Sequence, residues 1–157
     1  MNHNDQPLGK VFTELAKAYA GSFVDRLRHL PINRYFYALV VIDQHSGNLS
    51  QTDLASELYV DKASLVRMLD YLEAEDCIVR KPNPRDRRAH ILELTPKALA
   101  MIPEIADAIQ STNAGVAKQA QTLGIPDFEK VITALMRDFQ SKSSSDYTIQ
   151  FVPRNDA

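Results

Sequence analysis

Apolar residues near the N-terminus recur every three or four positions between Leu8 and Leu30. This spacing places them on one face of a helix, and Pro31 ends that helix because proline cannot continue its hydrogen-bond pattern. A second apolar helix is expected from Arg34 to Gln44, where the turn-forming sequence HSGN follows. The first stripe consists of Leu8, Val11, Phe12, Leu15, Tyr19, Phe23, Leu27 and Leu30.

The next segment contains two helix starts in close succession. Ser50 is a good N-cap with Asp53 three residues later, and Asp61 can cap a second helix that runs to about Glu75. The apolar stripe of this second helix is formed by Leu65, Met68, Leu69 and Leu72. Two short helices joined by a tight turn predict a helix-turn-helix.

After Cys77 the apolar period changes from helical spacing to two, which is typical of strands. The segment is expected to form a short strand IVRK, a turn PNPRDRR and a returning strand AHILEL. Pro82 and Pro84 exclude a helix here. A β-hairpin directly after a helix-turn-helix predicts a winged helix.

The C-terminal part is expected to be helical again. Thr95 and Pro96 have the character of an N-cap and a first helical residue, and Pro103 should kink the helix that continues towards Gln121. The segment GIPDFEKVITALMRDFQ supplies a last amphipathic helix, and beyond it the tail DYTIQFV alternates like an edge strand. The apolar face of the last helix carries Phe128, Val131, Ile132, Leu135 and Phe139.

Composition changes this picture in one place. The chain has 18 Lys+Arg against 20 Asp+Glu, a net charge of −2, but Val79–Ile91 holds five cations and one carboxylate. A basic cluster on the hairpin favours a phosphate partner in spite of the acidic total. With 45% hydrophobic and 24% charged residues, no apolar run near 20 residues, no signal-peptide pattern and one cysteine, we expect a cytoplasmic protein.

Residues 49–99 resemble the MarR (multiple antibiotic resistance regulator) family of bacterial transcription factors. The resemblance is carried by LSQTDLA, YVDKASLVRMLDYLE and VRKPNPRDRRAHILELTPKAL, above all by Asp86-x-Arg88 followed by Leu94-Thr95. The flanking helices extend the likeness to about residues 8–140. This chain departs from the family pattern at four positions. Asp76 and Ala98 stand where glycines are usual. Val66 stands where Thr is common, and Tyr71 where Arg is common.

The resemblance implies a mostly α fold, a winged helix-turn-helix with N- and C-terminal dimerisation helices. The expected division is dimerisation helices at 8–30 and 123–140, a DNA-binding domain at 32–95, a linking helix at 96–122 and a tail at 141–157. The two terminal stripes need a burial partner, which a homodimer would supply, although they can also pack on each other within a monomer. A dimer would read a palindrome with half-sites about 34 Å apart.

The helix after Asp61 is the candidate reader of the major groove. Its polar face carries Lys62, Ala63, Ser64, Val66 and Arg67. Arg67 can bond guanine in a bidentate manner, and Val66 or Ala63 can touch a thymine methyl. The alternative is an ordinary solvated helix face.

The hairpin tip carries Arg85, Asp86, Arg87 and Arg88. In the resembled family the arginine of Asp-x-Arg enters the minor groove, a role that falls here to Arg88, braced by Asp86. Arg85 and Arg87 are expected to contact phosphates. The alternative is a surface turn whose charge only aids solubility.

Effector sensing rests on weaker signals. The family often binds small aromatic ligands beside the dimer helices, and this chain has candidate lining residues at Tyr19, Phe23, Arg34, Tyr35 and Tyr37; aromatic residues at this spacing are more often simply core. Cys77 is expected to be buried and structural. The histidines lack close metal-ligand spacing, and no phosphate loop or nucleophile motif suggests an enzyme, so no cofactor and no membrane partner are expected.

Two functions therefore remain open. The first is a homodimeric DNA-binding repressor with a small-molecule effector. The second is a winged-helix module whose partner is a protein, with the DYTIQFV tail adding a strand to that partner.

Overall fold

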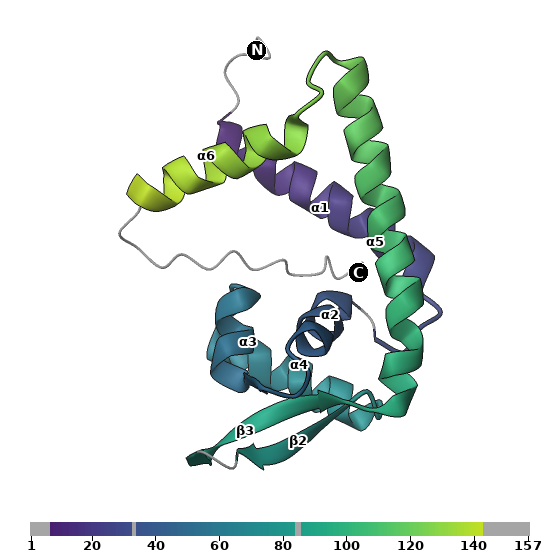
Figure 1. Cartoon of the computed structure of the whole chain (residues 1–157), viewed down its shortest axis with the longest axis vertical. Coiled ribbons are helices and arrows are strands. Elements are labelled where there is room, and N and C mark those ends of the chain that lie inside the picture. Colours follow the sequence, from purple (N-terminus) through teal and green to yellow (C-terminus); the bar gives the residue numbers. More distant parts are fainter. Residues whose placement is uncertain (1–6, 33, 84–85, 143–157) are drawn as a thin grey trace, which may run out of the picture.

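The computed structural model describes residues 7–32, 34–83 and 86–142, with the backbone alone described at 23, 86–89 and 142. The order of elements is α1 (Leu8–Leu27), α2 (Phe36–Gln44), β1 (Leu49–Ser50), α3 (Gln51–Glu57), α4 (Lys62–Ala74), β2 (Ile78–Asn83), β3 (Asp86–Leu94), α5 (Pro96–Thr122) and α6 (Phe128–Lys142). The predicted tail DYTIQFV lies outside the described residues. The predicted fold class, mostly helical with a hairpin after a helix-turn-helix, is confirmed (Figure 1).

The predicted helix starts are confirmed by their hydrogen bonds. Ser50 accepts from the Asp53 backbone N–H at 3.1 Å, and the Asp53 carboxylate accepts from the Ser50 N–H at 3.3 Å, which completes a capping box. Asp61 caps α4 and Thr95 caps α5, each accepting from the N–H three residues on. These caps are local interactions, which is why the sequence pattern located them.

The sheet differs from the prediction in two ways. Its order is β1-β3-β2, so the two-residue strand β1 pairs with the returning strand, Leu49 opposite Leu92, which the pattern did not indicate. The hairpin is also longer than expected, because the predicted turn over residues 82–88 is wrong. Pro82 pairs opposite His90 within the ladder. Proline is tolerated there because β2 is an edge strand, where a missing N–H costs no ladder hydrogen bond.

The ends of two helices also need correction. α1 ends at Leu27 instead of continuing to Leu30, and a turn follows in which the Leu30 N–H bonds the Leu27 carbonyl at 2.9 Å. α2 begins at Phe36, two residues after the predicted start. Pro31 explains the early end, because the residue before a proline is pushed out of the helical region and its turn unwinds first.

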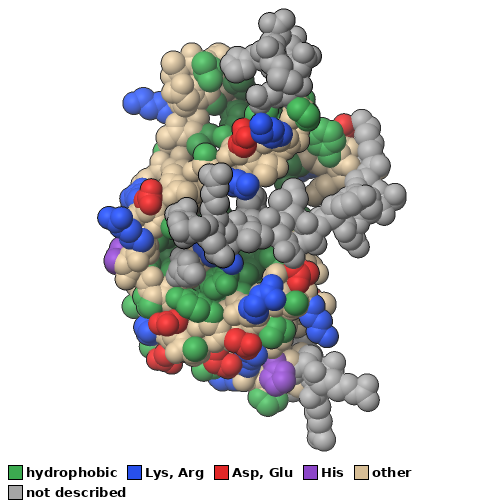
Figure 2. Space-filling view, turned by 180° about the vertical axis from the view of Figure 1, so that it is seen from behind, with side chains coloured by type: hydrophobic (Ala, Val, Ile, Leu, Met, Phe, Trp, Pro, Cys, Tyr) green, Lys and Arg blue, Asp and Glu red, His purple; other side chains and the backbone are tan. Residues whose placement is uncertain are grey.

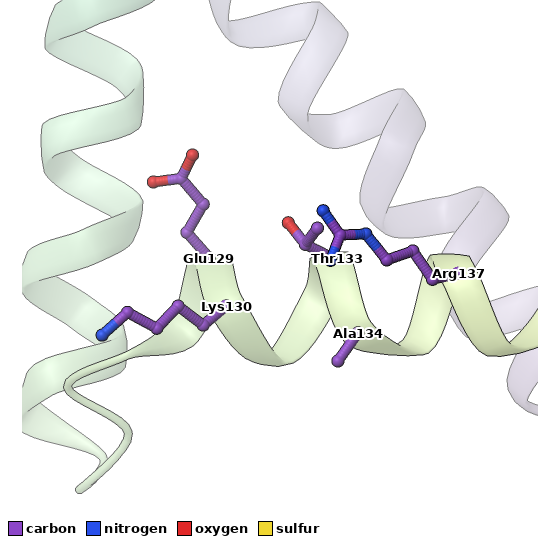
Figure 3. A pocket seen from close by; sticks show the side chains of 5 residues that line it. All are labelled: Glu129, Lys130, Thr133, Ala134 and Arg137. Atoms are coloured by element: carbon purple, nitrogen blue, oxygen red, sulfur yellow. The ribbon is translucent and has the colours of Figure 1, made fainter.

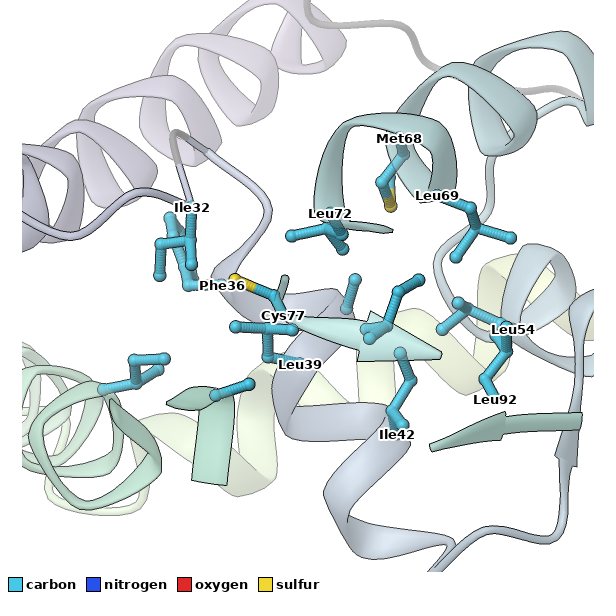
Figure 4. Close-up of a cluster of buried hydrophobic side chains, with 14 of the residues drawn as sticks. Ile32, Phe36, Leu39, Ile42, Leu54, Met68, Leu69, Leu72, Cys77 and Leu92 are labelled. Carbon is cyan, nitrogen blue, oxygen red and sulfur yellow. The ribbon is translucent and has the colours of Figure 1, made fainter. Parts of the chain in front are cut away.

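One hydrophobic core holds the winged helix together. Phe36, Leu39 and Ile42 of α2 meet Leu54 of α3, Leu69 and Leu72 of α4 and Leu92 of β3, all close to zero exposure (Figure 4). Ile105 and Ala108 extend this core onto α5. The predicted α4 stripe is therefore confirmed in full.

The terminal helices are less covered. α5 runs along one side of the molecule from the hairpin to the end that carries α1 and α6, and it contacts both (Figure 1). Hydrophobic side chains are visible on the surface at that end (Figure 2). The exposed ones are Leu8, Val11, Phe12 and Leu15 on α1 and Val131, Leu135, Met136 and Phe139 on α6. Much of both predicted stripes thus remains open to solvent in the single chain.

Candidate nucleic-acid interface

The N-terminal turn of α4 is organised by a short polar network. The Ser64 hydroxyl donates to Asp61 Oδ2 at 2.7 Å and accepts from Arg67 Nη2 at 3.0 Å. The Ser64 backbone N–H donates to Asp61 Oδ1 at 2.9 Å. These hydrogen bonds from Asp61 through Ser64 to Arg67 hold the guanidinium against the first turn of the helix.

Electrostatics reinforce this arrangement. The side-chain and backbone hydrogen bonds from Ser64 lower the pKa of Asp61, and the nearby positive charge of Arg67 acts in the same direction. A carboxylate at a helix N-terminus is also favoured by the helix dipole. Asp61 is therefore ionised at neutral pH and acts as a fixed anchor for the recognition turn.

The rest of the predicted α4 face is available to a partner. Lys62, Ala63 and Val66 are exposed, on the side of the helix away from the buried Leu65, Met68 and Leu69. Neighbouring polar and small apolar side chains of this kind suit base edges, which present both hydrogen-bonding groups and methyl groups. The face is geometrically free to enter a groove.

Two of the five hairpin cations, Arg80 and Lys81, pair with carboxylates of the protein. Arg80 is only 22% exposed because it bridges to α4, with Nη2 on Asp70 and Nε 3.4 Å from Glu73. Lys81 pairs with Glu93 on the neighbouring strand β3. Each cation thus has a carboxylate partner within the protein, and the Lys81 side chain remains 54% exposed.

Asp70 and Glu73 connect α4 to the hairpin, a contact that the sequence pattern did not indicate. They lie three residues apart on α4, a spacing that puts both on one helix face, and together they tie the recognition helix to β2. The contact fixes the angle between α4 and the hairpin. The three-residue spacing of Asp70 and Glu73 indicates that they share a helix face, but it does not indicate that Arg80 of β2 contacts them.

The tip of the hairpin carries the other predicted group. Arg85 lies outside the described residues, while Asp86, Arg87 and Arg88 lie on the backbone of β3 with side chains outside the described set. Their roles remain predictions. The backbone places these residues at the end of β3 remote from α5, where the hairpin projects from the body (Figure 1).

The turn after α4 adopts the conformation expected from its aspartate. Asp76 has φ of 54°, in the left-handed region, and its carbonyl accepts from Thr95 Oγ1 at 2.7 Å. Cys77 follows with 0% exposure, and burial raises the pKa of its thiol. The predicted burial of Cys77 is confirmed, and a raised pKa keeps the thiol protonated and unreactive.

The predicted effector-pocket residues fall into two groups. Tyr19 of α1 donates to Asn113 of α5 and is hydrogen-bonded to Tyr37 of α2, whose pKa is raised by burial and by that neighbour. Arg34 lies over the Tyr35 ring at 5.6 Å. The Phe23 side chain lies outside the described set, so its predicted place in the pocket stays untested.

Tyr71 of α4 adds a residue that the pocket prediction did not include. Its ring packs edge-on against Tyr35 with centroids 5.5 Å apart. The contact joins the recognition helix to the segment before α2. It also explains how the chain uses a tyrosine on α4 where an arginine is common in the family it resembles.

Two surface hollows are lined by other residues. One of about 310 Å³ lies on α6, where Glu129, Thr133 and Arg137 project from one side of the helix (Figure 3). The other, of about 430 Å³, lies between α2, β3 and α5, beside Gly47 and Glu93. Neither contains the predicted aromatic residues, so these hollows do not support the proposed pocket.

Two searches of the described ranges complete the picture of the site. No group of three or more His, Cys, Asp or Glu side chains within residues 7–32, 34–83 and 86–142 is arranged to hold a metal ion. None of the helices in the same ranges is both long and apolar enough to span a bilayer.

Comparison with known proteins places this arrangement among DNA-binding regulators. A model of the MarR family matches residues 30–89, which include α2, α3, α4, β2 and the start of β3. The chain is similar to the transcriptional repressor CouR bound to a 23-mer DNA duplex, with 25% identity, a TM-score of 0.71 and coverage of 87% of this chain and 95% of that one.

Two further structures share the fold. A mutant MarR from E. coli complexed with operator DNA is 24% identical, with a TM-score of 0.72 over 82% of this chain and 93% of that one. A MarR transcriptional regulator from Methanosarcina mazei is 17% identical, with a TM-score of 0.76 over 87% of this chain and 98% of that one.

Proposed function

We propose that this chain, whose residues 30–89 match a model of the MarR family, is a winged-helix transcriptional regulator of that type: a homodimeric repressor that binds a palindromic operator and is released by a small-molecule effector. The observation that carries the proposal is the exposed N-terminal face of α4. There, Arg67 is held by Ser64 and Asp61 beside a hairpin that Arg80 fastens to the same helix. Two similar proteins carry this fold in complexes with DNA.

In this proposal α4 reads the major groove. Lys62, Ser64 and Arg67 supply hydrogen-bond donors, while Ala63 and Val66 supply apolar contacts for thymine methyl groups. Ser64 and Arg67 exchange their internal hydrogen bonds for bonds to base edges. The exchange keeps the cost of binding low, because no buried polar group is left unpaired.

The hairpin supplies the second contact. Arg88 enters the minor groove, Asp86 orients it, and Arg85 and Arg87 bind flanking phosphates. Since Arg80 and Lys81 are already paired with carboxylates, the tip arginines are expected to account for most of the hairpin's counterion release.

Dimerisation follows from the exposed apolar faces of α1 and α6. Side chains such as Phe12, Leu135 and Phe139 are too numerous and too contiguous for a stable free surface, and a second copy supplies a matching face. A two-fold axis then presents two copies of α4 to successive turns of the duplex.

The effector response is proposed to act through the contacts that join the dimer helices to the DNA-binding helices. The bond between Tyr19 and Tyr37 links α1 to α2, and the bond from Tyr19 to Asn113 links α1 to α5. A phenolic or aromatic ligand that competes for these hydroxyl groups would shift α2 and its neighbours relative to α1. Such a shift changes the separation of the two recognition helices.

The test is fluorescence anisotropy of the purified full chain against its own upstream intergenic DNA, with a scrambled duplex as the control, over a salt series. We expect tighter binding to the native sequence and an affinity that falls steeply as salt rises. Equal and weak binding to both duplexes at low salt would contradict the proposal. It would favour instead the protein-interaction module, which pull-down with the same purified chain would then address.

A further inference from the structure

Tyr59 occupies an unusual backbone position in the turn between α3 and α4. Its φ is 52°, in the left-handed region that side chains other than glycine rarely adopt. The Tyr59 N–H bonds the Ser56 carbonyl at 3.3 Å, and the Val60 N–H bonds the Ala55 carbonyl at 3.1 Å. These two bonds end α3 in a motif whose left-handed position is usually glycine.

The strain at Tyr59 is not offset by burial. The residue is 67% exposed. An aromatic side chain normally stabilises a fold by burying a large apolar area. Within the single chain Tyr59 covers little apolar surface, so burial does not compensate for its strained backbone.

A second residue provides the comparison. Asp76 has nearly the same φ, 54°, and lies two residues after the end of α4, whereas Tyr59 lies three residues before its start. Aspartate tolerates the left-handed region because its short side chain bonds nearby backbone, and tyrosine has no such advantage. Only the position before α4 therefore holds a bulky aromatic at a conformational cost.

We propose that Tyr59 is a DNA-backbone contact that positions α4, its hydroxyl donating to a phosphate oxygen and its ring packing against the adjacent deoxyribose. The inference rests on the proposed function. Tyrosine hydroxyls are among the groups that bind phosphates in protein–DNA complexes. A protein partner is less well matched, because α3 and α4 lie at the opposite end of the molecule from the exposed faces of α1 and α6 (Figure 1).

This contact has a signature that separates it from the hairpin arginines. Tyrosine is neutral, so its contact with a phosphate does not change the number of counterions that the DNA releases on binding. Affinity should fall while the slope of log affinity against log salt stays the same, whereas removal of a phosphate-bound arginine lowers that slope by about one per contact.

The experiment compares Tyr59→Phe, Tyr59→Gly and the control Asp76→Gly with the wild-type chain, all at one protomer concentration. Tyr59→Phe keeps the ring and the strain and removes only the hydroxyl. We expect it to bind both the upstream duplex and the scrambled duplex about tenfold more weakly, with an unchanged salt slope and an unchanged Tm.

Tyr59→Gly relieves the strain and removes the whole side chain. We expect its Tm to rise by about 2–4 °C while its DNA affinity falls at least as far as that of Tyr59→Phe. Asp76→Gly relieves a smaller strain at the other end of α4. It should leave DNA affinity unchanged.

The outcomes separate this inference from the proposed function. If wild type binds neither duplex, the proposed function fails first. If wild type binds and Tyr59→Phe binds equally well, Tyr59 is not a hydrogen-bonding contact and the inference is overturned. The same conclusion follows if Tyr59→Gly dissociates the dimer in sedimentation, since Tyr59 would then lie in a protein interface.

Discussion

The winged helix and the terminal helices use the same kinds of residue in opposite ways. Leu69 and Leu72 of α4 are fully buried, whereas Leu15 of α1 is 54% exposed and Phe139 of α6 is 58% exposed. Full burial of one such side chain is worth roughly 1.5–3 kcal/mol. The winged helix buries its apolar residues within one chain. The terminal helices leave theirs exposed, and burying them would add stability, which is why we propose that the dimer interface lies there.

The largest expected effect removes a core side chain from the self-sufficient region. Leu69→Ala should lower the free energy of unfolding by about 2–5 kcal/mol, because it leaves a cavity among fully buried neighbours. Urea unfolding at a fixed protomer concentration measures the loss. Val66→Ala on the exposed face of α4 is the matched control and should cost less than about 0.5 kcal/mol. A loss that is equally small for both would mean that the α4 core is loosely packed.

The next variant tests the exposed stripe of α6, for which we propose a partner in the dimer. Leu135→Lys places a charge within the exposed stripe of α6, and burying that charge unpaired should weaken the dimer by at least about hundredfold. Sedimentation velocity over a concentration series measures the dissociation constant. Ser141→Lys adds the same charge on the opposite face of α6 and should leave the dimer intact. Equal behaviour of the two variants would place the interface elsewhere.

A third variant tests the junction that joins the hairpin to α5. Thr95→Ala removes a hydroxyl that donates to the Asp76 carbonyl and caps the Ala98 N–H at 3.2 Å. Since Thr95 is buried, the carbonyl is left without its partner, and stability should fall by about 1–3 kcal/mol. Chemical denaturation provides the measurement. Thr95→Ser keeps the hydroxyl and should recover most of the loss; failure to do so would assign the effect to the lost methyl group.

On the DNA face, Arg67→Ala should reduce discrimination between the native and scrambled duplexes by about 1–3 kcal/mol, because a base contact carries sequence information. Anisotropy with both duplexes at one salt concentration gives the ratio. Parallel weakening on both duplexes, with the ratio preserved, would show that Arg67 contacts phosphate instead of a base.

The smallest expected effects are changes in the salt dependence of DNA binding, which distinguish Arg88 at the hairpin tip from Lys81 nearer its base. Arg88→Ala should weaken operator binding and lower the salt slope by about one, with the dimer intact. Lys81→Ala should change the slope little, because its ammonium already pairs with Glu93. Affinity measured across a salt series distinguishes the two. A slope that falls for Lys81→Ala and stays constant for Arg88→Ala would reverse the assignment.

Much of the fold was predictable because its signals are local. The caps at Ser50, Asp61 and Thr95 depend on residues three positions apart, and the α4 stripe depends on helical spacing. The left-handed turn at Asp76 also follows from neighbouring residues. The residues predicted to read DNA share one side of α4 for the same reason, because the geometry of a single helix decides which of its side chains lie together.

Apart from the helix ends near Pro31, the misses involve partners distant in sequence. β1 exists only because Leu49 and Ser50 meet β3, and Pro82 joins the hairpin ladder only because β2 is an edge. No local pattern indicates either pairing. For a similar reason the sequence did not indicate that Tyr35 of the proposed pocket packs against Tyr71 of α4, or that Tyr19 and Tyr37 are hydrogen-bonded to each other.

By itself the sequence determined the helices, their caps, the presence of a hairpin and the residues that face away from the core. The fold adds that two of the hairpin's cations, Arg80 and Lys81, are paired with carboxylates. Arg80 and Lys81 look like Arg87 and Arg88 in a list of residues, but they meet Asp70, Glu73 and Glu93 across the fold. The physical reason is that charge acts through distance in space, whereas a sequence records only distance along the chain.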